Sequence, residues 1–410
     1  MTLLILSLLF LLLGGAFGFT LIYLQQLQTI AKTAPAVVLQ PPEITDKSES
    51  QSPTSLSTVA VIIPVYNESD NVEACVQSVL NSCDWPSDRL GVWLVDDQST
   101  DDTWERAIAL QTRLADPRLH LIAGQPRPTE QPWMGKNWAC HQGYQQATGE
   151  FLLFLDADVR LHPGAIASAI AAAAAQTSDL LSGALTVECG CWAEWLAQPL
   201  IFSFITVVVP FAAINDPTSE SVFAAGPFML FRRTAYDKIG GHAAVANQVV
   251  EDVELARRIK QAGLTMTYTV LKELGTLRMY PTGQALWEGW TKNWYMGSQC
   301  NLKVTLQGAV TVFWVCAMPT LLLLGLLLWG AIAGWSVPLF IGIAIALVTI
   351  GLHYPIRRAF QAIAGTPTRY WWLIGASGLY VTAIILASII KTETGWGWTW
   401  RGRPLQRPTT

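Results

Sequence analysis

Two long stretches of the sequence contain no charged side chain, and they constrain the fold more than any other feature. No Asp, Glu, Lys or Arg occurs before Lys32, and none occurs between Lys303 and Arg357. About 20 consecutive apolar residues are enough to cross the hydrocarbon core of a bilayer. We therefore predict an N-terminal transmembrane anchor in residues 1–31, with a cleaved signal peptide as the alternative, and further membrane segments in residues 305–391.

The C-terminal stretch has room for about three membrane segments. Residues 334–338 contain Gly, Ser and Pro and can turn the chain midway, and residues 371–390 form another apolar run. Three arginines are expected in the loop between the last two segments: Arg357, Arg358 and Arg369. The positive-inside rule then places the catalytic domain in the cytoplasm. The basic tail, residues 392–410, conflicts with this orientation, so the number of C-terminal spans stays open.

Composition excludes several classes of protein. The chain is 51% hydrophobic and 14% charged, with a net charge of −4, so it has no basic surface for nucleic acid. Seven cysteines at irregular spacings do not form a disulfide framework. Cys189 and Cys191 have no second pair at ligand spacing, so a zinc site is not expected.

Between the anchor and the C-terminal segments, the pattern is that of an α/β domain. Residues 32–56 are rich in Pro, Ser and Thr and predict a flexible linker. Short β-branched runs then alternate with helical patterns, with strands expected at 59–65, 92–95, 119–123 and 151–155 and helices at 71–80, 103–114, 137–147 and 164–175. We predict a Rossmann-like, mostly parallel sheet in a catalytic domain over residues 57–304.

Polar side chains follow three of these strands. They are Tyr66 and Glu68 after the first strand, which also carries Pro64 at its end, Asp96 and Asp97 after the second, and Asp156 and Asp158 after the fourth. Ligands of such sheets bind beyond the carboxyl ends of the strands, so we expect these residues to meet at one edge.

The pair Asp156 and Asp158 predicts a metal site. Two carboxylates separated by one residue can hold Mg²⁺ or Mn²⁺, which would neutralise charge on a departing nucleoside diphosphate. A solvated turn is the alternative. Asp97 could accept hydrogen bonds from a base or a ribose, and Lys136 at the start of a helix could attract a phosphate.

Glu251 and Asp252 begin another helical pattern. They can be a negatively charged first turn favoured by the helix dipole, or Asp252 can be a general base. The apolar run 195–214 lies between this pair and Asp158. If both acidic motifs belong to one site, the run cannot cross the membrane and must be a core or interfacial helix.

Together these motifs resemble the family 2 glycosyltransferases. The motifs, in order, are Pro64-Val65-Tyr66-Asn67-Glu68, Asp96-Asp97, Gly135-Lys136-Asn137, Asp156-Ala157-Asp158 and Glu251-Asp252. The resemblance implies a glycosyltransferase A type fold and an inverting transfer from a nucleotide sugar, with Asp252 as the catalytic base and Asp158 on the metal beside Asp156. It also implies that the donor is bound by Pro64, Tyr66, Glu68, Asp97, Lys136, Asp156 and Glu251.

Residues 278–293 look like the branch that acts on carotenoids and related polyisoprenoid lipids. The processive members carry Q-x-x-R-W after the base, whereas Gln284 to Trp287 here lack the Arg. We therefore predict transfer of one sugar to a hydroxyl of a membrane lipid such as a hydroxylated carotenoid. The alternatives are a hopanoid, a polyprenyl phosphate or a diacylglycerol as acceptor, or a non-catalytic membrane scaffold.

Overall fold

The computed structural model describes residues 2–39 and 57–405. Within these residues the chain forms two compact units, each of which has its own packing. The α/β unit contains Ala34–Glu188 and Phe211–Met279, and the helical unit contains Met1–Thr33, Cys189–Pro210 and Tyr280–Arg407. The predicted catalytic domain, residues 57–304, therefore contributes residues 189–210 and 280–304 to the helical unit.

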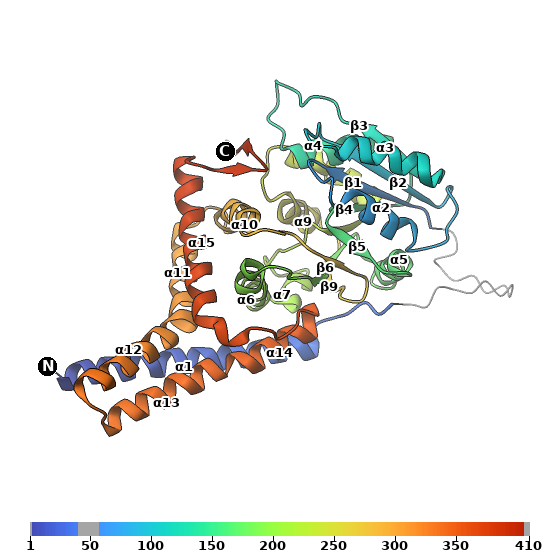
Figure 1. Cartoon of the computed structure of the whole chain (residues 1–410). Coiled ribbons are helices and arrows are strands. Elements are labelled where there is room, and N and C mark those ends of the chain that lie inside the picture. Colours follow the sequence, from blue (N-terminus) through green and yellow to red (C-terminus); the bar gives the residue numbers. More distant parts are fainter. Residues whose placement is uncertain (1, 40–56, 406–410) are drawn as a thin grey trace. The chain divides into compact units, whose positions relative to one another are not determined.

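The α/β unit is built on a seven-stranded sheet within the described residues (Figure 1), with strand order β3-β2-β1-β4-β8-β6-β9. The strands are β1 (Val59–Val65), β2 (Leu90–Asp96), β3 (Leu119–Ala123), β4 (Phe151–Leu155), β6 (Leu180–Ala184), β8 (Phe228–Arg232) and β9 (Met266–Val270). All neighbours pair in parallel except β8, which runs antiparallel to β4 and β6. The prediction of a mostly parallel, Rossmann-like sheet is confirmed.

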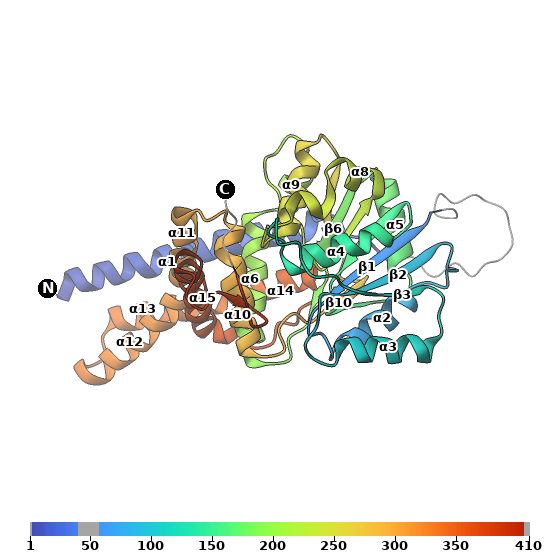
Figure 2. The same cartoon turned by 90° about the horizontal axis from the view of Figure 1, so that it is seen from above.

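Helices cover both faces of this sheet, which explains why β1, β2 and β4 are almost continuously apolar. The helices are α2 (Val72–Leu80), α3 (Thr103–Leu114), α4 (Gly135–Gln146), α5 (Ala165–Ala175), α7 (Phe211–Asn215), α8 (Arg233–Lys238), the 3₁₀ turn η2 (Gly241–Val245) and α9 (Glu251–Gln261). In Figure 2, α2 and α3 lie on one face of the strands and α4 on the other. A small second sheet contains β5 (Val159–Leu161), β10 (Gly275–Leu277) and β7 (Thr186–Val187).

The predicted linker lies partly outside the described residues, namely at 40–56. Its first residues are paired with the sheet. Ala36 forms a parallel bridge with Val270 of β9, and the Val37 amide donates to the Val270 carbonyl at 3.0 Å. This part of the predicted linker therefore extends the edge of the sheet at β9.

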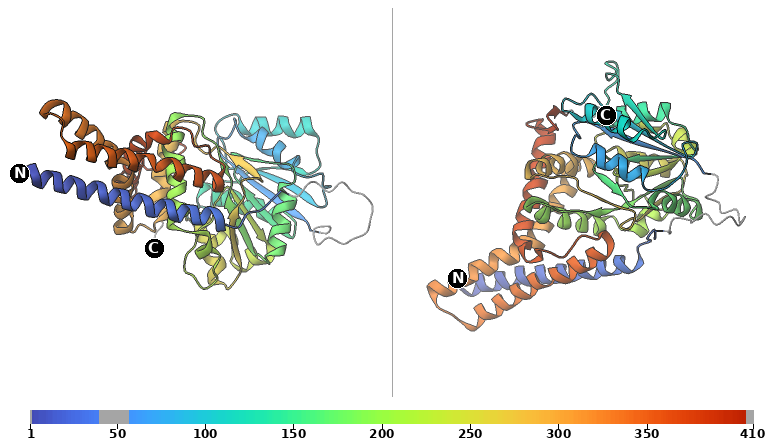
Figure 3. Two further views of the ribbon diagram at one scale, coloured as in Figure 1. Left: turned by 90° about the horizontal axis from the view of Figure 1, so that it is seen from below. Right: turned by 45° about the vertical axis from the view of Figure 1, so that its right-hand side comes forward.

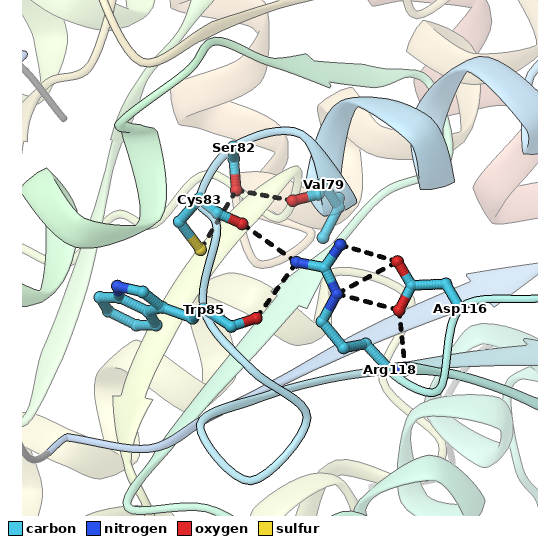
Figure 4. Close-up of polar contacts among 6 residues, drawn as sticks. All are labelled: Val79, Ser82, Cys83, Trp85, Asp116 and Arg118. Carbon is cyan, nitrogen blue, oxygen red and sulfur yellow. Dashed lines mark hydrogen bonds and ion pairs between the residues drawn. The ribbon is translucent and has the colours of Figure 1, made fainter. Parts of the chain in front are cut away.

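The loop between α2 and β2 is fixed by Arg118, just before β3 (Figure 4). Its guanidinium donates to the carbonyls of Cys83 at 3.0 Å and Trp85 at 3.3 Å, and it forms an ion pair of 2.7 Å with Asp116. Hydrogen bonds to Arg118 lower the pKa of the Asp116 carboxyl. Arg118 thus supplies the hydrogen bonds that these two carbonyls would otherwise accept within a strand or helix.

The helical unit contains four helices that are long and apolar enough to cross a membrane, judged by length and composition over the described residues. They are Ser7–Thr33, Leu302–Ala333, Val337–Ala364 and Trp371–Thr394. Large apolar side chains remain exposed on them, with Trp329 57%, Ile332 77% and Val337 72% accessible. Exposed apolar surface on this scale is typical of contact with lipid. The anchor and about three C-terminal segments were the predicted pattern.

These segments contain the helices α1 (Thr2–Thr33), α11 (Leu302–Val312), the π-helical turn η3 (Phe313–Ala317), α12 (Met318–Ala333), α13 (Val337–Gly351), α14 (His353–Ala364), the 3₁₀ turn η4 (Trp371–Leu373) and α15 (Ile374–Thr394). The predicted turn is present, because α12 ends at Ala333, the following Gly334 has a φ of 95°, and α13 begins at Val337. Helix α1 runs beside α13 and α14 (Figure 3). The unit is completed by α6 (Trp192–Val208), α10 (Gly283–Gly297) and the short strands β11 (Thr399–Trp400) and β12 (Arg403–Pro404).

The predicted apolar run 195–214 is not one helix but is divided between α6 and the short α7, and α6 is not among the four candidate spans of the described chain. It has 17 residues and packs in the helical unit against α15, α1 and α10. The chain leaves the α/β unit before α6 and re-enters it at Phe211. The two acidic motifs on either side of α6 therefore belong to one folded unit.

Arg357 differs from its predicted position. It was expected in a loop between spans, but it lies within α14 and is 3% exposed. Arg358 on the same helix is exposed, and Arg369 lies in the exposed segment that follows. Arg357 and Arg358 both lie within α14, so the loop between the last two segments has two charges fewer than predicted and keeps only Arg369.

Candidate active site

The carboxyl ends of β1, β2 and β4 lie at one edge of the sheet. Val65 pairs with Asp96, the Asp97 amide donates to the Val65 carbonyl at 2.8 Å, and Phe154 of β4 pairs with Ile62. Residues after these strands are therefore neighbours, as the sequence predicted. Pro64 is tolerated inside β1 because the pairing with β4 ends at Ile62, before its missing N–H matters.

The loops after β1 and β2 are tied together. Asn67 has a φ of 53°, a left-handed conformation that Asn adopts more readily than most residues. Its amide donates to Ser99 Oγ at 3.0 Å, and its Oδ1 accepts from the Thr100 amide at 2.8 Å. The Glu68 amide donates to Thr103 Oγ1 at 2.8 Å. These bonds hold Tyr66 and Glu68 in a fixed loop at the sheet edge.

The two aspartates that end β2 have different roles. Asp96 accepts from the Ser99 amide at 3.1 Å and so closes the turn after its own strand. Asp101 likewise accepts from the Thr103 amide at 3.0 Å at the start of α3. Asp97 is 4% exposed and lies between them at the edge. It remains the aspartate of this loop that we predict to bind a base or ribose.

Lys136 joins two distant parts of the sequence. Its Nζ lies 2.7 Å from Asp156 Oδ1 and 2.9 Å from Glu251 Oε1. Burial alone would lower the pKa of Lys136, but the two carboxylates raise it well above its usual value. The predicted donor-binding residues Lys136, Asp156 and Glu251 thus form one ion-pair cluster.

Asp252 lies next to this cluster on α9. Its Oδ2 accepts from the Gly226 amide and its Oδ1 from the Val253 amide, both at 2.9 Å. Burial and the charge of Glu251 raise the pKa of Asp252 to about 7, although Lys136 acts in the opposite direction. A carboxylate stabilised mainly by the helix dipole would have a lowered pKa. The direction of the shift therefore shows that burial and the charge of Glu251 outweigh the helix dipole at Asp252.

The pKa values of two cysteine thiols depend on several of the predicted charged residues. Burial raises the pKa of Cys140 on α4, and Glu251, Asp156 and Asp97 add to the rise against Lys136. Burial likewise raises the pKa of Cys75 on α2, with Asp158, Glu68 and Asp156 contributing. The structure thus brings the predicted charged residues together around α2 and α4: Glu68, Asp97, Lys136, Asp156, Asp158 and Glu251.

The sequence analysis assigned no role to two further residues of the site, Gly226 and Asn137. A Cβ on Gly226 would lie 3.0 Å from Asp252 Oδ2 and 3.2 Å from Lys136 Nζ, so this position has almost no room for a side chain. Asn137 is buried, and its Nδ2 donates to the carbonyls of Val245 at 2.8 Å and Ala246 at 3.1 Å. It fixes the segment that leads into α9. The signals were the Gly226-Pro227 pair and the Asn that follows Lys136.

The donor atoms at the edge suit a metal ion only in part. Within the described residues no group of three or more His, Cys, Asp or Glu side chains could hold a cation. Asp156 Oδ1 is engaged by Lys136. Mg²⁺ is commonly held by one or two carboxylates together with substrate phosphates. Asp158 and Asp156 therefore fit a cation that takes its remaining ligands from a bound donor.

The chain thus combines an α/β unit, which carries an acidic, lysine-centred site at the carboxyl edge of its sheet, with a helical unit that contains four candidate membrane helices. Residues 60–240 match Glycosyl transferase family 2, and residues 151–389 match Glycosyl transferase family group 2. The chain belongs to the family 2 glycosyltransferases.

Curated relatives include two enzymes named 4,4'-diaponeurosporenoate glycosyltransferase. The one from Staphylococcus haemolyticus is 26% identical over 257 residues, 62% of this chain and 64% of that protein. The one from Staphylococcus aureus is 28% identical over 246 residues, 58% of this chain and 61% of that protein. The chain thus matches less than two thirds of the length of these relatives.

Among solved structures, the chain is similar to the mannosyltransferase PcManGT from Pyrobaculum calidifontis, in complex with GDP-Man and Mn²⁺. The TM-score is 0.55 and the identity 19%, over 95% of this chain and 99% of that one. At this identity the likeness establishes the fold, which is of glycosyltransferase A type as predicted.

Proposed function

We propose that this protein transfers one sugar from a nucleotide-sugar donor to a hydroxyl of a carotenoid-type membrane lipid, with inversion at the anomeric carbon. The observation that carries the proposal is Asp252, a carboxylate held by the Gly226 amide with a pKa of about 7. A general base is most effective when its pKa lies near the working pH.

In the proposed reaction Asp252 takes the proton of the acceptor hydroxyl while the oxygen attacks the anomeric carbon. The nucleoside diphosphate leaves from the opposite side, which inverts the configuration. Lys136 stabilises the charge of the departing diphosphate, exchanging its contacts with Asp156 and Glu251 for phosphate oxygens. A divalent cation, Mg²⁺ or Mn²⁺, held by Asp158 and Asp156, would add positive charge at the same group.

The nucleotide half of the donor is assigned to the loops after β1 and β2. In this proposal Asp97 accepts hydrogen bonds from the base or ribose, and Pro64, Tyr66 and Glu68 bind the donor at the same edge. The hydrogen bonds between these two loops keep the edge rigid before the donor binds. Preorganisation of this kind lowers the entropic cost of binding.

The lipid acceptor is inferred from the relatives and from the helical unit. The staphylococcal relatives are named for 4,4'-diaponeurosporenoate, a carotenoid acid. Four candidate membrane helices fit an enzyme whose acceptor is dissolved in the bilayer. We propose that the catalytic domain faces the cytoplasm. Cysteines introduced at Asp102 and Arg257 of the α/β unit should then react with impermeant reagents only from that side.

A second candidate differs in the acceptor group. The relatives' substrate name denotes a carboxylate, which would give a sugar ester. A carboxylate is already ionised at neutral pH and needs no base. Asp252→Asn should therefore leave transfer to a carotenoid acid largely intact but should strongly impair transfer to a hydroxylated carotenoid.

The direct test uses membranes that contain the full chain. They are incubated with labelled UDP- and GDP-sugars and with a hydroxylated carotenoid or a carotenoid acid, and the lipid extract is analysed for the label and its anomeric configuration. Transfer to the hydroxyl with inverted configuration supports the proposal. Label that enters only the acid favours the second candidate, and retention of configuration contradicts both.

A further inference from the structure

Arg357 of α14 is a buried cation without an anionic partner in the described chain. It is 3% exposed, and its Nη1 and Nη2 atoms are buried without a hydrogen-bond partner among the described residues. The groups that interact with its charge most strongly are Tyr23, Cys189 and Cys316, none of them a carboxylate. The proposed sugar transfer gives this arginine no role.

Other polar groups of the helical unit gather around it. His353 precedes Arg357 by one turn, and its Nε2 atom is also buried without a hydrogen-bond partner among the described residues, while its ring bonds to the backbone of Val315. The Tyr23 hydroxyl donates to Ser203 Oγ at 2.7 Å. These groups come from α14, α1, α6 and η3, so the cluster is internal to the helical unit.

A cation in this position is costly. The free energy that is lost when a charge leaves water is recovered only if a partner of opposite charge binds it with good hydrogen-bond geometry. Long side chains near the ends of membrane helices usually reach water instead, as Arg358 does on the exposed side of α14. Arg357 lies on the buried side with Ile356 and Phe360, and the described chain supplies no carboxylate there.

We propose that Arg357 is the binding residue for the oxyanion, carboxylate or phosphate, of an amphiphilic lipid held in the helical unit. The planar guanidinium matches both groups, because it can donate two parallel hydrogen bonds to either. His353 Nε2 supplies a further polar atom one turn away.

An amphiphile fits better than a free ion because of where Arg357 lies. Helix α14 is the end of the third candidate membrane span. Its buried side is largely apolar, whereas Tyr354 and Arg358 are exposed. A helix with two such faces is typical of the boundary between headgroups and acyl chains. An acyl or polyene chain could remain in the apolar surroundings while its acid group reaches Arg357.

The test measures thermal unfolding of the full chain in a neutral detergent. Four compounds are titrated in turn: oleate, dioleoyl phosphatidic acid, the uncharged lipid monoolein, and inorganic phosphate. The variants are Arg357→Gln and, as the matched control on the same helix, Arg358→Gln. We expect the two acidic lipids to raise the melting temperature of the wild type and of the control, with little effect of monoolein or phosphate.

Arg357→Gln should weaken the apparent affinity for both acidic lipids by roughly 30-fold or more, as expected when one partner of a buried charge pair is removed. Should this variant not fold, Arg357→Lys takes its place, because it keeps the charge but loses the two-pronged geometry and should still bind several-fold more weakly. Unchanged affinity in the Arg357 variant would overturn the proposal. So would equal stabilisation by monoolein, and stabilisation by inorganic phosphate alone would exclude a lipid as the ligand.

Discussion

Replacing Asp252 with Asn tests the central feature of the site. The substitution keeps the shape of the side chain and an oxygen for the Gly226 amide, but it removes the charge that a base requires. We expect turnover with a hydroxyl acceptor to fall by roughly 10² to 10⁴-fold, the usual contribution of a general base. Donor affinity should change little, because Lys136 and not Asp252 forms the ion pairs with Asp156 and Glu251.

The pH profile carries a second, quantitative expectation. With a pKa of about 7, Asp252 is ionised in about one tenth of the molecules at pH 6. The value of kcat/KM for the wild type should therefore be about tenfold lower at pH 6 than on the plateau above pH 8. This ratio reports the pKa of the free enzyme, which is the state that the structure describes. The residual activity of Asp252→Asn should lack this dependence.

The raised pKa also predicts a change in stability with a definite sign. The pKa of Asp252 is about 7 in the folded protein against an ordinary value of 3.8. The neutral acid is therefore favoured in the folded state. The corresponding stabilisation is complete below pH 4 and is lost as the pH rises to about 7, by at most about 4 kcal/mol. Asp252→Asn, which has no charge to bury, should not lose stability over this interval.

The assay combines label transfer to extracted lipid, titration of the donor, and thermal melting at pH 5 and pH 8. Glu254→Gln is the matched control, because it removes a carboxylate of the same helix that pairs with Arg257 and Arg258 instead of the site. A flat activity profile between pH 5.5 and pH 7.5 would refute the assignment of Asp252 as base. A loss of donor affinity with unchanged turnover would make it a binding residue.

Three further predictions concern other parts of the α/β unit. Asp158→Ala and an excess of chelator should each abolish transfer. The melting temperature of Asp158→Ala should equal that of the wild type, because the backbone carbonyl of residue 158 still accepts from the Arg278 amide. Full activity in chelator would remove the metal from the reaction. Gly226→Ala should lower kcat/KM by roughly 10²-fold, because the added methyl group displaces Asp252. The control is Gly297→Ala, which should leave kcat/KM unchanged because the new methyl group meets nothing within 4 Å. Equal activities of the two variants would refute the tight packing at Gly226. Arg118→Ala should lower the free energy of unfolding by about 2 kcal/mol, measured by denaturant titration, because its hydrogen bonds and its ion pair are lost. The KM of the donor should not change, and an altered KM would extend the role of Arg118 to the site.

The sequence by itself determined the first half of the α/β unit. Strands β1, β3 and β4 and helix α3 begin and end at the predicted residues. Strands and helices alternate strictly in this part of the chain, so local hydrophobic periodicity is sufficient to locate them. The same order fixed the carboxyl ends of the strands, and with them the edge where Asp97, Asp156 and Asp158 lie. The roles of these carboxylates and of Asp252 remain predictions, because their position alone left a solvated turn or a charged first helical turn as alternatives.

The second half depended on contacts between distant residues. Strand β8 enters the sheet antiparallel between β4 and β6, although it follows β6 in the chain, and no local pattern signals this order. The ion pairs of Lys136 join residues 115 apart in sequence, since Lys136 pairs with Glu251 as well as Asp156. The amide that holds Asp252 comes from Gly226, 26 residues earlier in the same segment of the α/β unit.

Only the tertiary structure distinguished the two arginines of α14. Arg357 and Arg358 are adjacent and identical in the sequence, and both were expected in one exposed loop. Because successive residues of a helix differ by about 100° in direction, one side chain lies among buried helices and the other reaches the surface. The sequence shows which residues can carry a charge. The surroundings that determine the free energy of that charge, its pKa and its partner form only when distant segments pack together.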